Sequence, residues 1–290
     1  MNVVVEADIR GFFDHVNHEW LLKFLQQRIK DRRVLRLIVR MLKAGVMEDG
    51  LTRAGEEGTP QGSIISPLLS NIYLHYVLDI WFQRRIRRQC RGEAYLFRYA
   101  DDFVACFQYQ ADAEHFREIL GRRMEDFQLE LAEEKTQILE FGRYARENAY
   151  RRGEKPKEWD FLGVTFFCGK TRHGHFKVKR KTSRKKLRQS VARFTDWIRR
   201  YRGLMPTGEL LRRAKARVVG HLNYYAMTDN YDHCKLYVHL VCRSLFKWLN
   251  RRSQRKSYTW KGYLQALRHV GWPKVRIRIQ MNPFSPTPNV

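Results

Sequence analysis

The first half of the chain alternates short apolar runs with stretches of helical periodicity. The apolar run at residues 3–5 predicts a buried strand that ends at Asp8 or soon after. Apolar spacing predicts helices over residues 20–29 and 34–42, and Ser66-Pro67 is typical of a helix start. The other expected elements are a hairpin and loop over residues 47–62, a helix over 113–127, a strand over 137–141 and a hairpin over 159–178.

The second half changes character near residue 180. Apolar residues at steps of four, three, four and three predict an amphipathic helix with a basic outer face; they are Leu187, Val191, Phe194, Ile198 and Tyr201. More helices are expected around residues 207–227, 232–250 and 258–270. We therefore expect an α+β domain over residues 1–180, an all-helical basic domain over 181–275 and a loose tail over 276–290.

Charge divides the chain in the same way. The net charge is +26, yet residues 1–145 carry a net −1 and residues 146–290 a net +27. Because each neutralised phosphate releases counterions, this basic half indicates a nucleic-acid partner. A solvated basic surface or a membrane-facing patch is the alternative. No stretch approaches the roughly 18 uncharged apolar residues of a membrane helix, so we expect a protein of the bacterial cytoplasm with no membrane partner.

The five cysteines form no Cys-x-x-Cys pair, which argues against a disulfide framework or a zinc ribbon. Cys168, His173 and His175 are close in sequence but lack the usual spacing of zinc ligands, so no metal site is expected there.

Two aspartates interrupt an apolar pattern near residue 100. Residues 95–99 and 103–107 predict a hairpin with Asp101 and Asp102 at its turn, and Asp8 ends the first strand. If these strands are neighbours, the carboxylates meet and need cations to offset their repulsion. Mg²⁺ takes oxygen ligands, and two such ions about 3.5–4 Å apart catalyse nucleotidyl transfer. An Asp pair that serves only the turn is the alternative.

Five motifs, in family order, resemble those of reverse transcriptases. Tyr99-Ala100-Asp101-Asp102 is similar to their Tyr-x-Asp-Asp box, and residues 5–14 resemble the first palm aspartate motif. Residues 58–73, 134–136 and 161–163 are similar to the other three, and residues 220–225 echo the thumb of group II intron-encoded enzymes, the maturases. The resemblance implies a right-hand polymerase, with an antiparallel palm sheet packed on helices and part of the fingers over residues 1–180, followed by a helical thumb or maturase domain over residues 181–275.

The resemblance also implies roles at the reacting centre. Asp8 and Asp101 would bind two Mg²⁺ ions, or Mn²⁺ in their place, with Asp102 in support and the backbone carbonyl of Ile9 assisting. The Phe13 ring would exclude the 2′-hydroxyl of a ribonucleotide and so select deoxynucleotides. Alternatively, Phe13 is an ordinary residue of the hydrophobic core. Pro60, Gln61 and Gly62 would contact the incoming dNTP. Lys135 would lie near the pyrophosphate, or else be an ordinary surface lysine.

For nucleic acid, the resemblance implies contacts by Tyr99 and a primer-grip turn at Leu162 and Gly163, for which an ordinary hairpin is the alternative. Phosphate contacts by the thumb are expected from a basic set: Lys179, Arg180, Lys181, Arg184, Lys185, Lys186 and Arg188. Trp197, Tyr201, Tyr224 and Tyr225 could stack on bases, but core packing is the favoured use of each. The expected partners are template RNA, intron RNA and a DNA primer or target.

Family members carry a fingers region before the first palm aspartate, where this sequence starts. We therefore expect a truncated product, an incomplete coding sequence or one piece of a split enzyme whose fingers lie on a separate chain. A maturase-type RNA-binding protein without catalysis, or an inactive fragment, is the competing hypothesis. Viral RNA polymerases usually carry Gly before the paired aspartates, so Ala100 and Phe13 favour reverse transcription.

Overall fold

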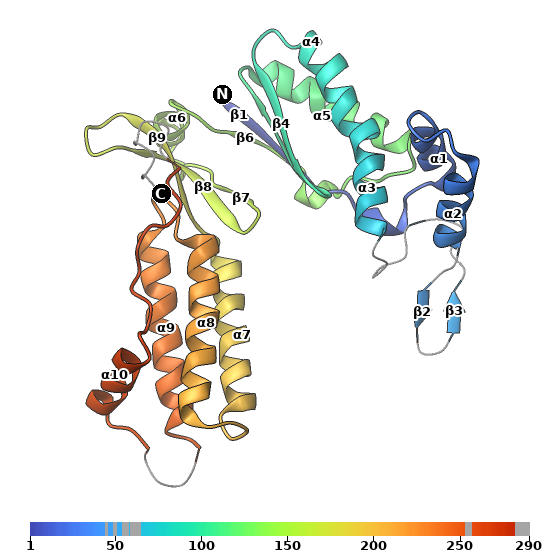
Figure 1. Cartoon of the computed structure of the whole chain (residues 1–290). Coiled ribbons are helices and arrows are strands. Elements are labelled where there is room, and N and C mark those ends of the chain that lie inside the picture. Colours follow the sequence, from blue (N-terminus) through green and yellow to red (C-terminus); the bar gives the residue numbers. More distant parts are fainter. Residues whose placement is uncertain (44–45, 49–50, 54–57, 59–64, 253–256, 282–290) are drawn as a thin grey trace. The chain divides into compact units, whose positions relative to one another are not determined.

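The computed structural model describes residues 1–43, 46–48, 51–53, 58, 65–252 and 257–281. The chain forms two compact units (Figure 1). The first comprises Met1–Phe161 and Lys170–Lys177, and the second comprises Leu162–Gly169 and Val178–Val290. The fold is the expected α+β class, with an antiparallel sheet in the first unit and helices in the second. The functional boundary between palm and thumb near residue 180 stays a prediction.

A four-stranded sheet organises the first unit. Its order is β4 (Ala94–Tyr99), β5 (Asp102–Phe107), β1 (Val3–Ala7) and β6 (Gln137–Glu140), and all neighbours are antiparallel. Strand alternation gives β1 two different faces. Val3, Val5 and Ala7 enter the main apolar core, whereas Val4, Glu6 and Asp8 point to the other face. The polar end of β1 is therefore set by the same register that buries its apolar side.

Helices cover the core-forming face of this sheet. The helices of this unit are α1 (His18–Gln26), α2 (Arg32–Lys43), α3 (Ser66–Leu74), α4 (Arg87–Gln89), α5 (Gln110–Glu125) and α6 (Ala145–Arg151). Of these, α5 packs directly on β1 and β5, and α1 packs on α2 and α3. Between α3 and α4 the helix continues through two π-helical turns, His75–Asp79 and Phe82–Ile86. Tyr73 is fully buried and its hydroxyl donates to the carbonyl of Phe127 at 2.7 Å, which fixes α3 against the segment after α5.

Two smaller sheets complete the strands. A hairpin of β2 (Val46–Glu48) and β3 (Leu51–Arg53) confirms the hairpin expected after residue 47. β7 (Trp159–Phe161), β8 (Val164–Lys170) and β9 (Phe176–Thr182) form a three-stranded sheet. Residues 159–178, where one hairpin was expected, contain two turns: Leu162 and Gly163, with φ of 51° and 78°, turn the chain between β7 and β8 before β8 pairs with β9.

The second unit is built on four helices: α7 (Arg184–Tyr201), α8 (Thr207–Tyr225), α9 (Tyr231–Leu249) and α10 (Trp260–His269). Each agrees with a helix expected from the periodicity. The apolar stripe of α7 packs on α8 and α9 around fully buried residues such as Ile198, Leu222 and Val241. The Ser183 hydroxyl caps α7 by accepting from the Lys186 N–H at 3.3 Å.

Three local expectations need correction. Ser66 does not cap α3: it is the first helical residue, and Ile65 precedes the helix without a side-chain bond. The helix α6 was missed because its seven residues, Ala145–Arg151, bury only two alanines and show little apolar periodicity. Residues 276–281 are not loose, since Arg278 and Ile279 donate backbone hydrogen bonds to the Ala226 carbonyl at 2.7 and 3.1 Å.

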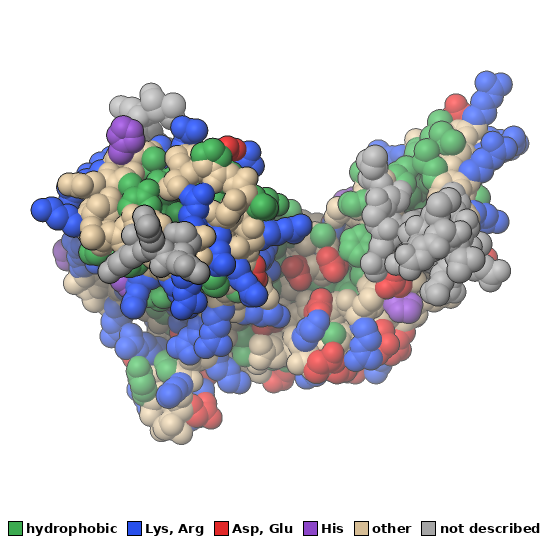
Figure 2. All heavy atoms as spheres, turned by 90° about the horizontal axis from the view of Figure 1, so that it is seen from below, with side chains coloured by type: hydrophobic (Ala, Val, Ile, Leu, Met, Phe, Trp, Pro, Cys, Tyr) green, Lys and Arg blue, Asp and Glu red, His purple; other side chains and the backbone are tan. Residues whose placement is uncertain are grey.

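Surface charge differs between the units. Figure 2 shows Lys and Arg side chains over much of the helical unit, while Asp and Glu side chains gather on the first. Among the helices whose residues are described, none is long and apolar enough to cross a bilayer.

Candidate active site at the ends of the central strands

Strand register brings two of the expected carboxylates together. The β1–β5 ladder ends at the pair Ala7–Phe103. One residue further, Asp8 leaves β1 where Asp102 begins β5, on the face that also carries Glu6. Asp101 lies in the two-residue turn between β4 and β5. The three aspartates expected from the sequence therefore occupy adjoining ends of neighbouring strands.

The hairpin turn has a strained backbone. Ala100 has φ of 56°, a left-handed conformation that costs a non-glycine residue roughly 1 kcal/mol. A positive φ at the first turn position matches the right-handed twist of hairpin strands. The turn therefore depends on outside contacts to hold its shape.

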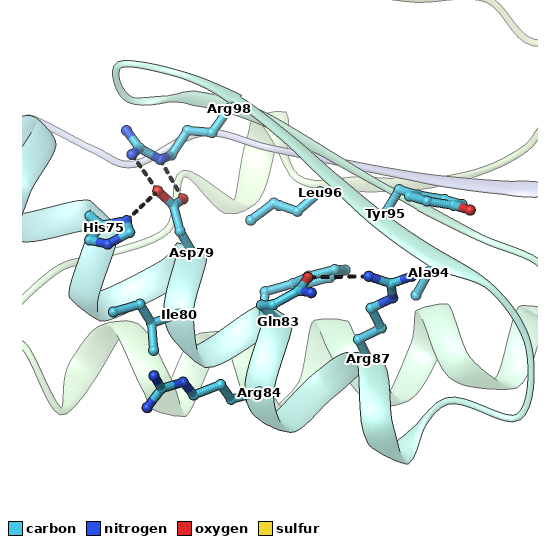
Figure 3. A pocket seen from close by; sticks show the side chains of 11 residues that line it. His75, Asp79, Ile80, Gln83, Arg84, Arg87, Ala94, Tyr95, Leu96 and Arg98 are labelled. Atoms are coloured by element: carbon cyan, nitrogen blue, oxygen red, sulfur yellow. Dashed lines mark hydrogen bonds and ion pairs between the residues drawn. The ribbon is translucent and has the colours of Figure 1, made fainter.

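Arg98 supplies such contacts, and sequence reasoning missed it. Its guanidinium binds both oxygens of Asp79 at 2.6 and 2.7 Å (Figure 3). It also donates to the Asn71 side chain and to the Ala100 carbonyl, each at 2.9 Å. Arg98 is only 12% exposed and pairs with Phe103, whose ring lies in the core. A charged residue at an inward strand position was the available signal.

The same side chains line an open groove of about 490 Å³ beside the edge strand β4. Arg84, Arg87 and Tyr95 form part of its wall, as Figure 3 shows. Arg87 lies over the Tyr95 ring, 5.6 Å from its centre. Among the described ion pairs, neither Arg84 nor Arg87 is bound to a carboxylate. The part of the groove that these two arginines line is therefore positively charged.

Negative charge accumulates at the carboxylate end of the sheet. Burial raises the pKa of Glu6 above its ordinary value, and the nearby carboxylates of Asp160, Asp102 and Asp8 raise it further. A hydrogen bond from the Gln137 amide, at 2.8 Å, opposes this rise. The Glu6 carboxyl thus senses three other acidic groups, an arrangement that favours a cation.

Lys135 is the cation that the structure places there. Its ammonium forms a hydrogen-bonded ion pair with Asp8, and this bond raises the pKa of Lys135. Backbone bonds fix the approach: Ala132 N–H donates to the Asp8 carbonyl and Arg10 N–H to that of Glu130, both at 2.8 Å. Ile9, expected to offer its carbonyl, is buried and forms a bridge with Leu131. Sequence reasoning had placed Lys135 by the pyrophosphate rather than on an aspartate.

The oxygen-only donor set of Asp8, Asp101 and Asp102 suits a hard cation such as Mg²⁺. Within the described residues, no three His, Cys, Asp or Glu side chains stand ready as a complete metal site. The Lys135 ammonium binds one carboxylate oxygen of Asp8, so a cation at that oxygen would have to displace it.

Phe13 and Gly58 lie together on the first unit. Phe13 is half-buried, and its ring centre is 5.4 Å from that of Phe12. Gly58 has φ of 82°, and a Cβ there would be 2.8 Å from the Asp14 carbonyl oxygen and 2.9 Å from that of Phe13. Only glycine fits so close to another backbone. Gly58 is thus fixed beside Phe13, while Pro60, Gln61 and Gly62 lie outside the described residues.

On the second unit, Leu162 and Gly163 are held by α7 and α8. The Tyr224 hydroxyl donates to the Leu162 carbonyl at 3.0 Å, and Ser183 N–H donates to the Gly163 carbonyl at 3.0 Å. The Lys186 side chain passes Gly163, with its Cγ 3.0 Å from where a Cβ would lie. One expected phosphate-binding lysine therefore adjoins the expected primer-grip turn.

The other basic candidates divide into two groups. Arg184, Lys185 and Arg188 are exposed on the first turns of α7, in positions that can reach a solvent-borne phosphate. Lys179, Arg180 and Lys181 are half-buried on β9, where the Lys181 ammonium lies 4.8 Å from the centre of the Phe167 ring. Tyr99 is 65% exposed, so its ring is free to meet a ligand.

Comparison with known proteins gives this arrangement a family. The family model described as reverse transcriptase (RNA-dependent DNA polymerase) matches residues 1–166. The protein YkfC of Escherichia coli is 31% identical over 235 residues, which covers 72% of this chain and 57% of the relative. The group II intron-encoded protein LtrA of Lactococcus lactis is 48% identical over 71 residues, covering 24% of this chain and 12% of LtrA.

The chain thus spans 57% of the length of YkfC and a smaller share of LtrA. A telomerase from Candida albicans, solved with a fragment of telomeric RNA, aligns over 92% of this chain and 46% of its own at 12% identity, with a TM-score of 0.46. The match of the family model over residues 1–166 decides the assignment, and the chain belongs to the reverse transcriptase family, with group II intron-encoded proteins among its relatives.

Proposed function

We propose that this chain carries the palm and thumb of an RNA-directed DNA polymerase of the group II intron kind, which copies RNA from a DNA primer. One observation carries the proposal: Asp8, Asp101 and Asp102 adjoin at the ends of β1 and β5, where Glu6 already senses excess negative charge. Two bound Mg²⁺ ions would lower the barrier to attack by the primer hydroxyl and stabilise the leaving pyrophosphate oxygen.

The chain's own residues prepare that reaction. Asp8 and Asp101 would bind the ions, with Asp102 in support and the Ile9 carbonyl assisting. Lys135 must release Asp8 when a divalent ion binds, because both compete for the same carboxylate oxygens. Its 63% exposed side chain can swing toward the dNTP phosphates, where an ammonium stabilises the departing charge.

Substrate contacts follow from the residues around this centre. Phe13 would meet the sugar of the incoming dNTP, and Pro60, Gln61 and Gly62 would contact the same dNTP. Template, primer and intron RNA would be bound by Tyr99 and by the basic side chains of β9 and α7. The net +27 of residues 146–290 supports that role for the second half.

The test is extension of a DNA primer on an RNA template by the purified chain, with Mg²⁺ or Mn²⁺ and with EDTA. We expect synthesis that EDTA abolishes and that Asp101→Asn or Asp102→Asn lowers by at least about a thousandfold. Glu118→Gln, which removes an exposed carboxylate paired with Arg122 on α5, is the matched control and should retain full activity. Extension by either aspartate variant at the wild-type rate would contradict the two-metal assignment.

The second candidate is a maturase that binds intron RNA without polymerising. Its support is that most of the excess charge lies away from the carboxylates, in residues 146–290. Fluorescence anisotropy with a labelled intron fragment separates the two. If the wild-type chain binds RNA tightly and in a salt-dependent way but extends no primer with either ion, this second candidate is favoured. If it neither extends a primer nor binds RNA, the chain is an inactive fragment.

A further inference from the structure

The Gly-His-Leu-Asn-Tyr-Tyr run at residues 220–225 has no role in the chemistry above, although it ends α8 beside the Leu162–Gly163 turn. Tyr224 is 51% exposed, and its hydroxyl donates to the Leu162 carbonyl at 3.0 Å. Tyr225 is half-buried against the helical core, and its ring meets that of Tyr224 edge-on with centres 4.7 Å apart. The two adjacent tyrosines therefore face the turn in different ways.

The turn has a backbone that its own sequence does not favour. Leu162 has φ of 51°, and a bulky residue in the left-handed region is a genuine outlier. Strain of this kind persists only where surrounding contacts impose it. The Tyr224 hydroxyl on one carbonyl and the Ser183 N–H on the next are such contacts. Without the first of them, Leu162 can relax toward an ordinary extended conformation.

Tyr225 restricts the second turn residue. A Cβ on Gly163 would lie 2.8 Å from the Tyr225 hydroxyl oxygen. Gly163 also has φ of 78°, so both the space and the backbone require glycine. The Tyr225 ring thus forms a wall against which the turn is seated.

The end of α8 is itself fixed, so the tyrosines have a firm base. Asn230 is fully buried, and its amide donates to the Tyr225 carbonyl at 2.7 Å and to the Thr182 hydroxyl at 2.8 Å. Its side-chain oxygen accepts from Thr182 N–H at 2.8 Å. The last residue of β9 and the last residue of α8 are locked to each other through this one amide. Ser183 follows Thr182 directly and donates its N–H to the Gly163 carbonyl, so this lock also holds the Leu162–Gly163 turn.

We propose that Tyr224 is a positioning residue whose hydroxyl holds the Leu162–Gly163 turn in the strained form that grips the primer strand. Tyr225 acts as the wall that seats the turn, and neither ring stacks on a base. This inference rests on the proposed polymerase function, since the gripping role of the turn comes with it. It explains why two tyrosines stand together at the end of α8, one exposed and one half-buried.

Tyr224→Phe is the decisive variant, because it removes the hydroxyl and keeps the ring. Hydrogen exchange across residues 159–167 should speed up several-fold as the turn loosens. In primer extension, KM for the RNA–DNA primer–template should rise about fivefold, equivalent to about 1 kcal/mol, with kcat within about twofold of wild type. Tyr231→Phe, an exposed tyrosine on α9 without a contact to the turn among the described hydrogen bonds, is the control and should match wild type in both assays.

Unchanged exchange across the turn in Tyr224→Phe overturns the inference, whether or not the chain polymerises. Faster exchange with unchanged KM also overturns it, because the contact would then be structural only. If Tyr224→Phe kept the wild-type KM and Tyr224→Ala had a raised KM, the ring would act by stacking on a base, which contradicts the inference. If the wild-type chain extends no primer, the proposed function fails. The Kd for the RNA–DNA primer–template, measured by fluorescence anisotropy, then replaces KM when Tyr224→Phe is compared with the wild type and with Tyr231→Phe.

Discussion

Arg98 binds the turn between β4 and β5 through the Ala100 carbonyl, and the free energy of its contacts can be estimated from the structure. Arg98→Lys keeps the positive charge and removes the planar fork that binds both Asp79 oxygens while reaching the Ala100 carbonyl. One ammonium cannot maintain both the helix contact and the turn contact. The turn that carries Asp101 then loses its attachment to the helix that follows α3.

The magnitude follows from the contacts and their burial. A hydrogen bond to a charged group contributes about 1.5–3 kcal/mol, and Arg98 at 12% exposure is only partly screened by solvent. Lysine retains part of the pairing, so we expect Arg98→Lys to lower the free energy of unfolding by about 2 kcal/mol. Arg98→Met leaves Asp79 with His75 alone, at 3.3 Å, and should cost about 3–4 kcal/mol.

Urea unfolding of both variants, with Asp79→Asn as the partner in a double-mutant cycle, measures the coupling. The rate of primer extension at saturating primer and dNTP reports whether the turn that carries Asp101 is still correctly placed. This rate should fall at least about tenfold in Arg98→Lys. Arg87→Lys is the control, since Arg87 lines the same groove and contacts Gln83 at 3.5 Å but does not touch the turn. A coupling energy below about 0.5 kcal/mol, within the additivity of independent sites, would refute the reasoning.

Three other predictions concern packing, sugar selection and pH. Asn230→Ala leaves the Thr182 N–H without its partner, while the Tyr225 carbonyl keeps the Met227 N–H, so urea unfolding should show a loss of about 1–3 kcal/mol. Asn230→Asp should also be destabilised, because a carboxylate cannot donate. Phe13→Ala should raise incorporation of ribonucleotides relative to dNTPs, measured by single-nucleotide extension, and an unchanged ratio would exclude the sugar gate. Burial lowers the pKa of His221 to about 4 from 6.5; the unfolded chain therefore binds the proton first, and stability should fall as pH drops from 6.5 toward 4 and stay level above 6.5. His221→Phe, which can keep the stack on the Tyr237 ring, should flatten that decline in a pH series of urea midpoints.

Many of the helices and strands could be predicted from the local pattern of apolar and polar residues. Strand and helix periodicity placed β1, β4, β5 and the helices α7 to α10 within a few residues of their bounds. The Tyr-Ala-Asp-Asp hairpin was also expected, because two apolar runs flank a short polar turn. Local rules failed where a local signal was weak or absent: α6 buries little, and the turn at Leu162 requires a conformation that leucine does not prefer.

The order of the amino acids specifies which chemical groups are present and where along the chain: carboxylates at strand ends, a basic second half and a glycine at position 58, where two backbones approach closely. Tertiary structure alone decided which of these groups meet. β1 pairs with β5 across about 100 residues of chain and with β6 across more than 130 (Glu6 with Gln137, Val3 with Glu140), which brings Asp8 next to Asp102 and into contact with Lys135. The contacts of Arg98 with Asp79 and of Tyr224 with Leu162 likewise join separate elements. Periodicity reports which face of an element is apolar, whereas the partner of a polar side chain is fixed only when those faces pack.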